Sequence, residues 1–203
     1  MAFCQIVLGR DIVKLVKENP HNFKWWDDKV MEHEKMCPSD PVPIPPGDLD
    51  PHCYYPLSEE HPWHCQIHRD SFGYGEVPGQ IDQRLIVDFR WFGYVKPEEH
   101  NCVEFSETIR DGFGMPQPTF SFTINDEDAE RCAEMITDMA VVARKLGGFL
   151  PGAEPKYLAP GSALHICGTY RAGESVKDSV VDRFGVVYGH PDLVLGGCGV
   201  IPT

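Results

Sequence analysis

The chain has 203 residues, of which 42% are hydrophobic and 24% charged, a composition typical of a globular protein. Its 18 basic and 31 acidic side chains give a net charge of −13 at pH 7, which repels phosphate backbones. We therefore expect no nucleic-acid partner. No apolar run is long enough to span a membrane, and the first ten residues lack the features of a secretory signal.

The first third of the chain is predicted to combine two helices with an irregular segment. Apolar residues recur at helical spacing from Asp11 to Lys35, and Asn19-Pro20 interrupts the pattern. The segment from Pro38 to Pro62 is rich in proline, which lacks a backbone donor. We expect this segment to wrap over a surface rather than to pair in a sheet.

Three strands are predicted in the middle of the chain. Arg84–Val95 alternates between two sets of side chains and places Asp88 and Arg90 on one face. The apolar segments at Cys102–Ser106 and Thr119–Ile124 are expected to be antiparallel neighbours.

A long helix is predicted to follow these strands. Asn125 is a favourable N-cap, and the acidic residues 126–128 suit the positive end of a helix. The helix is expected to stop at Gly147-Gly148. From Pro151 onward we expect turns and short apolar strands.

The eight cysteines are scattered, and none forms a Cys-x-x-Cys pair. This pattern favours free, buried thiols over a disulfide framework.

A histidine-rich stretch runs from His61 to His68 and contains His64 and Cys65. Imidazole and thiolate are zinc ligands, but the spacing matches no common zinc module, and Pro62-Trp63 would break a helical ligand face. The pattern favours a structural or substrate-binding role over a metal site. A zinc-stabilised domain using His61, His64, Cys65 and His68 stays open as an alternative.

The next segment, Arg69–Gly75, alternates aromatic and small residues and ends in glycines. Such a loop can present Phe72 and Tyr74 to a ligand, while Asp70 accepts hydroxyl hydrogen bonds. The alternative is a hairpin turn whose aromatic rings fill the core.

Two further segments near the C-terminus are candidates for chemistry. His165 lies in an apolar stretch, where burial would keep its imidazole neutral, as a general base requires; a core histidine is the alternative. The glycines at 196–199 would let backbone N–H groups approach a phosphate, unless they form a simple exit from a strand. The chain has no complete Gly-x-Gly-x-x-Gly fingerprint.

In their order, these segments resemble the sugar-oxidising flavoenzymes of the glucose–methanol–choline (GMC) family. The resemblance covers nearly the whole chain, from Ala2 to Thr203. It is carried by His64–Gly75, Arg84–Gly93, Gly114–Phe120, Gly147–Gly152, His165–Gly173 and the terminal Gly-Gly-Cys-Gly-Val-Ile-Pro-Thr.

The resemblance implies an α+β fold, in which an antiparallel-sheet substrate domain with helices accompanies C-terminal strands of an incomplete FAD-binding domain. Residues 1–20 would then be a remnant of the FAD-binding domain. Residues 21–158 would form the substrate-binding domain, and residues 159–203 would return to the FAD domain.

The resemblance also implies the site residues. His165 would be the catalytic base that removes a sugar hydroxyl proton while a hydride passes to FAD. Residues 197–199 would approach the flavin. The sugar would be contacted by Gln66, His68, Asp70, Phe72, Tyr74 and Arg90.

The implied reaction oxidises the C2 hydroxyl of an aldopyranose such as glucose to a ketone, with O2 or a quinone as electron acceptor. The complete enzyme would be a homo-oligomer, and no metal is expected in the site.

This sequence departs from the family pattern in three features. It lacks the Gly-rich dinucleotide motif and the flavin-linking histidine of family members, and it stops before an asparagine that partners the catalytic histidine. We therefore expect the 203-residue chain alone neither to bind FAD tightly nor to oxidise sugars. A gene fragment, an incomplete gene model and one half of a split enzyme, with the N-terminal half as its partner, all fit. A non-catalytic carbohydrate-binding remnant is the alternative function.

Overall fold

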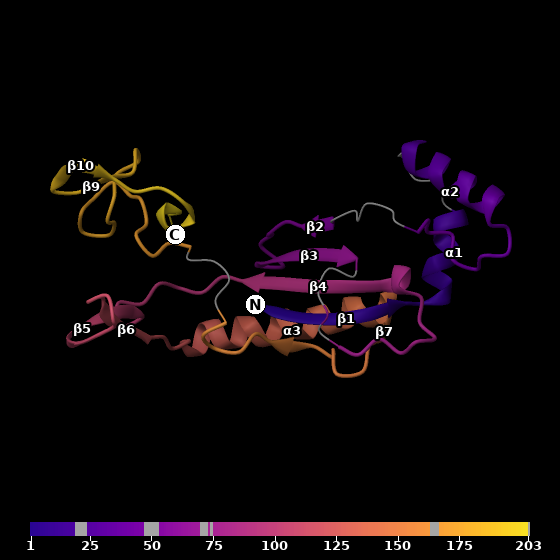
Figure 1. Cartoon of the computed structure of the whole chain (residues 1–203), viewed down its shortest axis with the longest axis horizontal. Helices are drawn as coiled ribbons and strands as arrows, with labels where there is room; N and C mark the ends of the chain where they lie inside the picture. The colour runs from indigo at the N-terminus through magenta and orange to yellow at the C-terminus, as the bar shows by residue number, and fades with distance from the viewer. Residues whose placement is uncertain (19–23, 47–52, 70–72, 74, 163–166, 203) are drawn as a thin grey trace. The chain divides into compact units, whose positions relative to one another are not determined.

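The computed structural model describes residues 1–18, 24–46, 53–69, 73, 75–162 and 167–202 (Figure 1). The chain divides into two compact units. The first unit comprises residues 1–96 and 102–158, and the second comprises residues 97–101 and 159–203. The functional assignment of residues 1–20, 21–158 and 159–203 stays a prediction.

A six-stranded sheet forms the centre of the first unit, with the order β2-β3-β4-β1-β7 and with β8 also paired to β1. All of its strand pairings are antiparallel, as expected (Figure 1). The strands are β1 (Ala2–Leu8), β2 (Cys53–Tyr55), β3 (Trp63–Arg69), β4 (Ile86–Gly93), β7 (Gly147–Phe149) and β8 (Lys156–Tyr157). The predicted strand at Arg84–Val95 is therefore confirmed as β4, preceded by the short 3-10 helix η1 (Gln83–Leu85).

Helix α3 (Asp126–Leu146) covers one face of this sheet. It begins where predicted, with the Asn125 side chain accepting a hydrogen bond from the Asp128 N–H, and it ends at Gly147. Met135, Met139 and Ala143 are fully buried against β1, β3 and β4. Burial of this apolar stripe is the main force that holds helix and sheet together.

The two predicted N-terminal helices are confirmed as α1 (Arg10–Glu18) and α2 (Lys24–Met36). The prediction that Pro38–Pro62 makes no sheet pairing is wrong, because β2 pairs with β3. The three residues of β2 include no proline, so their N–H groups are available to the ladder. Tyr54 and Tyr55 are largely exposed there, whereas Ile44 is buried.

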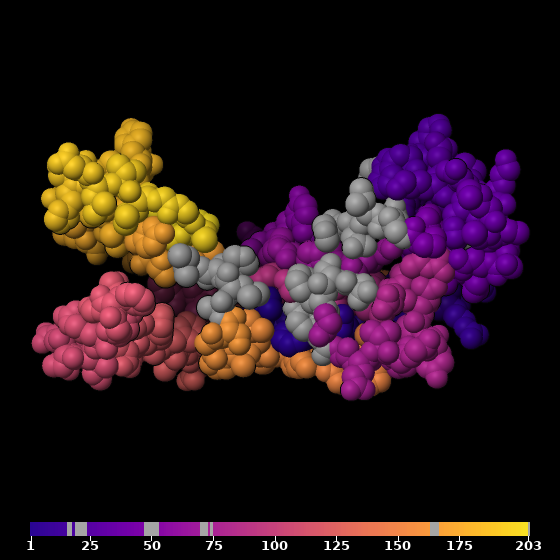
Figure 2. Space-filling view, in the orientation of Figure 1, coloured from indigo at the N-terminus to yellow at the C-terminus, as the bar shows by residue number. Residues whose placement is uncertain are grey.

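The expected antiparallel pair after β4 is confirmed as β5 (Cys102–Arg110) and β6 (Pro116–Ser121). Its strands carry several exposed apolar side chains, among them Phe105 and Phe120. The residues of this pair form the rose-pink part of the space-filling view (Figure 2).

The second unit is built from turns and short elements, as expected. They are β9 (Val186–Val187), β10 (His190–Val194) and the 3-10 helix η2 (Cys198–Val200). Residues 168–172 run beside η2, with Gly168 N donating to Cys198 O, Tyr170 N to Gly199 O and Ala172 N to Val200 O.

All eight cysteines lie among the described residues, and all are free thiols, as predicted. Only Cys4 and Cys65 are buried, so the expectation of general burial is wrong. None of the described helices has the length and apolar character needed to cross a bilayer.

Candidate functional site

Three predicted sugar-contacting residues lie on the sheet face opposite α3. Gln66 and His68 of β3 stand directly across from Arg90 and Asp88 of β4. Directly opposed residues of antiparallel strands point to the same side of a sheet. Gln66, His68 and Arg90 therefore share one polar patch, beside Asp88 as the strand pattern predicted.

The patch is partly open to solvent. Gln66, His68 and Arg90 are each half-buried, and the His68 Nε2 lies 3.4 Å from the Gln66 Oε1. Planar donors and acceptors at this exposure can contact the hydroxyl groups of a bound sugar.

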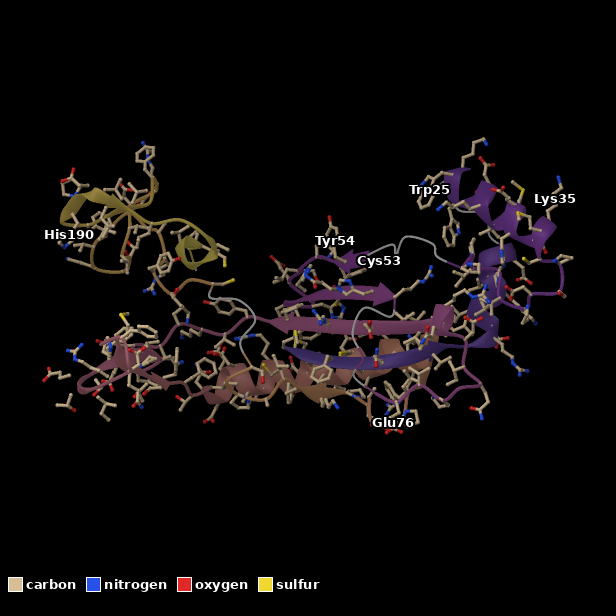
Figure 3. The ribbon with its side chains drawn as sticks, viewed as in Figure 1. Trp25, Lys35, Cys53, Tyr54, Glu76 and His190 are labelled. Atoms are coloured by element: carbon tan, nitrogen blue, oxygen red, sulfur yellow. The ribbon has the colours of Figure 1, made fainter. Side chains whose placement is uncertain are left out.

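An aromatic row lies beside the polar patch on the same face. The His64 ring is 6.0 Å from the Tyr54 ring and 6.1 Å from the Phe92 ring, between centroids. Tyr54 stands on β2 at the edge of the sheet (Figure 3). Rings at the edge of a polar patch provide apolar surfaces on which the faces of a sugar ring can stack.

The other end of this sheet face is covered. Ile86, Leu150 and Ala153 form a second buried cluster, against which Val77 and Ile81 pack. At the border between the covered and the open ends, Gln5 and Asp88 are almost completely buried. There the Gln5 Nε2 donates a hydrogen bond to the Asp88 Oδ1.

Gly75 contacts the sheet at this border. Its N–H donates to the Gln5 Oε1 at 3.0 Å. A side chain at this position would meet the Ala153 Cβ at 2.8 Å and the Pro151 carbonyl at 3.0 Å, so only glycine fits without displacement. An open cavity of about 450 Å³ lies here, lined by Gly73, Gly75, Glu76, Pro151 and Gly152.

The other predicted sugar-contacting residues and the predicted catalytic base lie outside the described residues. These are Asp70, Phe72, Tyr74 and His165. Their roles stay predictions.

The zinc alternative is not supported by the geometry. Cys65 is buried on the α3 side of β3, whereas His64 and His68 lie on the other side. Among the described residues, no group of three or more His, Cys, Asp or Glu could hold a metal ion.

The predicted cofactor-facing residues form a tight turn in the second unit. Gly197 has a φ of +88°, and Gly199 packs directly under the Tyr170 ring, where a Cβ would lie 2.3 Å from Cζ. The Tyr170 hydroxyl donates to the Gly196 carbonyl at 3.0 Å. Gly197 and Cys198 are exposed, so their backbone is accessible to a planar group such as a flavin. The turn therefore fits a cofactor that approaches along the backbone.

Gln5 was not predicted from the sequence as a site residue. The available signal was its position as the one polar residue in the apolar run Phe3–Leu8. A polar residue within a buried strand needs partners there, and this requirement could have marked it.

A model of the GMC oxidoreductase family matches residues 97–203, more than half of the chain. The chain belongs to the GMC oxidoreductase family. It is 43% identical over 203 residues to a pyranose 2-oxidase of Lyophyllum shimeji, a match that covers all of this chain and 33% of that protein. It is 45% identical over 212 residues to a pyranose 2-oxidase of Emericella nidulans, covering all of this chain and 34% of that protein.

More distant relatives are also similar to this chain. A C-glycoside 3-oxidase of Arthrobacter globiformis is 28% identical over 155 residues, covering 74% of this chain and 29% of that protein. The chain thus spans about a third of the length of the curated relatives that it matches.

Proposed function

We propose that this GMC chain supplies the sugar-binding face and the catalytic base of an FAD-dependent oxidoreductase. The reaction oxidises the C2 hydroxyl of an aldopyranose such as glucose to a ketone. The residues gathered by β3 and β4 carry the proposal, because Gln66, His68 and Arg90 lie on one open face of the sheet. The identity of 43% and 45% to pyranose 2-oxidases supports the substrate class.

The chain's own residues would perform two tasks. Gln66, His68 and Arg90 would bind the sugar hydroxyl groups, together with Asp70, Phe72 and Tyr74. His165 would remove the proton of the C2 hydroxyl, so that the C–H bond at C2 can break with its electron pair.

FAD would supply the acceptor for that hydride and would pass the electrons to O2 or a quinone. Residues 197–199 would hold it through their backbone. In this proposal, residues 1–20 and 159–203 belong with a FAD-binding domain and residues 21–158 with the substrate domain of an α+β, homo-oligomeric enzyme.

The test is a chimera in which this chain replaces the matching third of the Lyophyllum shimeji enzyme. We expect a yellow flavoprotein whose flavin is bleached by glucose under anaerobic conditions. His165→Ala should abolish the bleaching, while His190→Ala, an exposed histidine of β10, should leave it unchanged. A flavin-loaded chimera that glucose does not reduce would refute the proposal, as would a normally active His165→Ala variant.

A non-catalytic sugar-binding function remains the second candidate, because the polar patch and the aromatic row both lie in the first unit. Titration of the 203-residue chain with glucose and with FAD separates the two. Since these residues contain no Gly-x-Gly-x-x-Gly, we expect weak FAD binding by the chain alone. Sugar binding by the chain together with an inactive chimera would favour the second candidate.

A further inference from the structure

Gln5 is a buried glutamine in the middle of the central strand pair of the sheet, with 1% of its surface exposed. Both polar atoms of its side chain form hydrogen bonds, since Nε2 donates to Asp88 and Oε1 accepts from the Gly75 N–H. Its backbone is used as well, with N donating to Ala153 O and O accepting from Leu150 N, each at 3.0 Å. Gln5 therefore joins three segments that are far apart in the sequence.

Two of these connections reach the proposed sugar site. Gly75 is the next residue in the sequence after Tyr74, the last of the predicted sugar-contacting residues Asp70, Phe72 and Tyr74. Asp88 stands directly across from His68 and two residues before Arg90 on the same face. The side chain of Gln5 thus lies between Gly75 and Asp88, which borders the polar patch.

We propose that Gln5 is a positioning residue, which holds the Gly75 backbone in a fixed place relative to Asp88 and so relative to the strand that carries Asp88 and Arg90. The meaning of this role for sugar binding rests on the proposed function. The role itself is a statement about contacts within this chain and can be tested without sugar or flavin.

The hydrogen-bonding groups of Asp88 and Gly75 explain why glutamine occupies position 5. A carboxylate only accepts hydrogen bonds and a backbone N–H only donates them. A side chain placed between Asp88 and Gly75 must therefore donate at one end and accept at the other, as an amide does. An unsatisfied group at so buried a position would be costly.

Glutamate in place of Gln5 retains the shape and the acceptor toward Gly75 but removes the donor toward Asp88. At pH 7 the Q5E variant would place two carboxylates in contact, which repel one another. The double variant Q5E/D88N reverses the donor and the acceptor, since the amide introduced at position 88 can donate to the carboxylate introduced at position 5. It therefore restores the hydrogen bond between the two side chains, with the negative charge on residue 5 instead of residue 88.

The measurement is hydrogen exchange of the Gly75 amide in the full 203-residue chain, corrected for the intrinsic rate at each pH. At pH 7 we expect Q5E to exchange about tenfold faster or more than wild type. We expect Q5E/D88N to lie within about threefold of wild type. The amide of Met139 in α3 serves as a control for the fold and should not change.

The pH profile provides a readout that a loss of packing would not produce. In Q5E, protection of Gly75 should rise from pH 7 to pH 5, because one carboxyl of the coupled pair takes up a proton and donates to the other. In wild type it should stay level over this range. The charged and titratable groups that the described elements bring around the pair are Cys4, His68, Glu76, Arg90 and Lys156.

The proposal is overturned if Q5E retains wild-type protection of Gly75 at pH 7, or if the double variant fails to restore it while Met139 stays protected. If Q5E does not fold, the double variant decides. A folded double variant with a protected Gly75 supports the role, and an unfolded one refutes it. Because none of these outcomes involves sugar oxidation, failure of the proposed function would be recognised separately in the chimera.

Discussion

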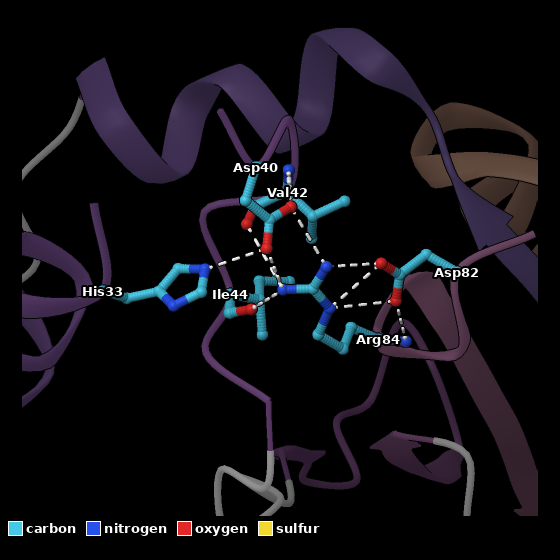
Figure 4. Close-up of polar contacts among 6 residues, drawn as sticks. All are labelled: His33, Asp40, Val42, Ile44, Asp82 and Arg84. Carbon is cyan, nitrogen blue, oxygen red and sulfur yellow. Dashed lines mark hydrogen bonds and ion pairs between the residues drawn. The ribbon is translucent and has the colours of Figure 1, made fainter. Parts of the chain in front are cut away.

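The Asp40 carboxylate and the Arg84 guanidinium form a two-point ion pair, with Oδ2 2.9 Å from Nη1 and Oδ1 3.1 Å from Nη2 (Figure 4). Asp82 binds the other side of the same guanidinium, and the Ile44 carbonyl accepts from Nη1 at 2.6 Å. His33 of α2 contacts Asp40 at 3.0 Å. Arg84, just before β4, therefore fastens α2 and the proline-rich segment to the sheet.

Arg84→Ala should lower the free energy of unfolding by about 2 kcal/mol, because it leaves two half-buried carboxylates without their partner. Urea unfolding followed by circular dichroism measures this loss. Lys24→Ala is the matched control, since Lys24 and Asp28 form an exposed ion pair. That variant should change stability by less than about 0.5 kcal/mol. Equal losses in the two variants would contradict the role of Arg84.

The same network predicts acid sensitivity. The Arg84 hydrogen bonds hold the pKa of Asp40 and of Asp82 below the usual range of a carboxyl group. A depressed folded-state pKa contributes stability that is present above the ordinary value near pH 4 and is lost as the pH falls toward the folded value. Wild type should therefore lose more stability than Arg84→Ala between about pH 5 and pH 2.5. Parallel losses in urea titrations over this range would refute the prediction.

Asp128 joins the start of α3 to the chain after β4. Burial raises its pKa, but hydrogen bonds from the Arg131 side chain and the Lys96 N–H outweigh that effect and hold the pKa below the usual range. Its Oδ2 lies 2.9 Å from the Lys96 N. Asp128→Ala should cost about 2 kcal/mol in urea unfolding, since it leaves two partly buried donors without an acceptor. Asp126→Ala, at an exposed position of the same turn, should cost much less, and a comparable loss there would contradict this explanation.

Gly199→Ala should destabilise the second unit by about 2 kcal/mol, because the new methyl group would overlap the Tyr170 ring. Hydrogen exchange at the Tyr170 amide, which donates to Gly199 O at 3.1 Å, reports the change. Gly196→Ala is the control, since no atom lies within 4 Å of the added methyl group. Faster exchange in the control than in Gly199→Ala would show that the packing argument is wrong.

The cysteine thiols should divide into two classes by their reactivity toward alkylation. Burial raises the pKa of both Cys4 and Cys65 to about 12, with further contributions from Asp88 and Asp138, respectively. At pH 8 these thiols are protonated and enclosed, so iodoacetamide should modify the exposed Cys37 and Cys53 first. Mass spectrometry of native and urea-unfolded chain tests this, and labelling of Cys65 at the rate of Cys53 in the native state would contradict it.

The sequence by itself determined the elements whose signals are local. The Asn125 cap and the terminal glycines set the bounds of α3, and strand alternation put Asp88 and Arg90 on one face. Both signals depend on neighbouring residues, so no distant contact was needed to interpret them.

Tertiary structure alone decided which strands of the six-stranded sheet became neighbours and in which register they pair. It brought Gln66 opposite Arg90 and placed Gln5 between Asp88 and Gly75. It also paired β3 with β2, which lies in a segment that was expected to stay unpaired. Strand register is set by contacts between residues far apart in the chain, and a shift of one residue would turn every side chain to the other face. The polar patch of this chain therefore depends on the pairing of strands across the sheet. Each strand by itself determines only which of its residues share a face.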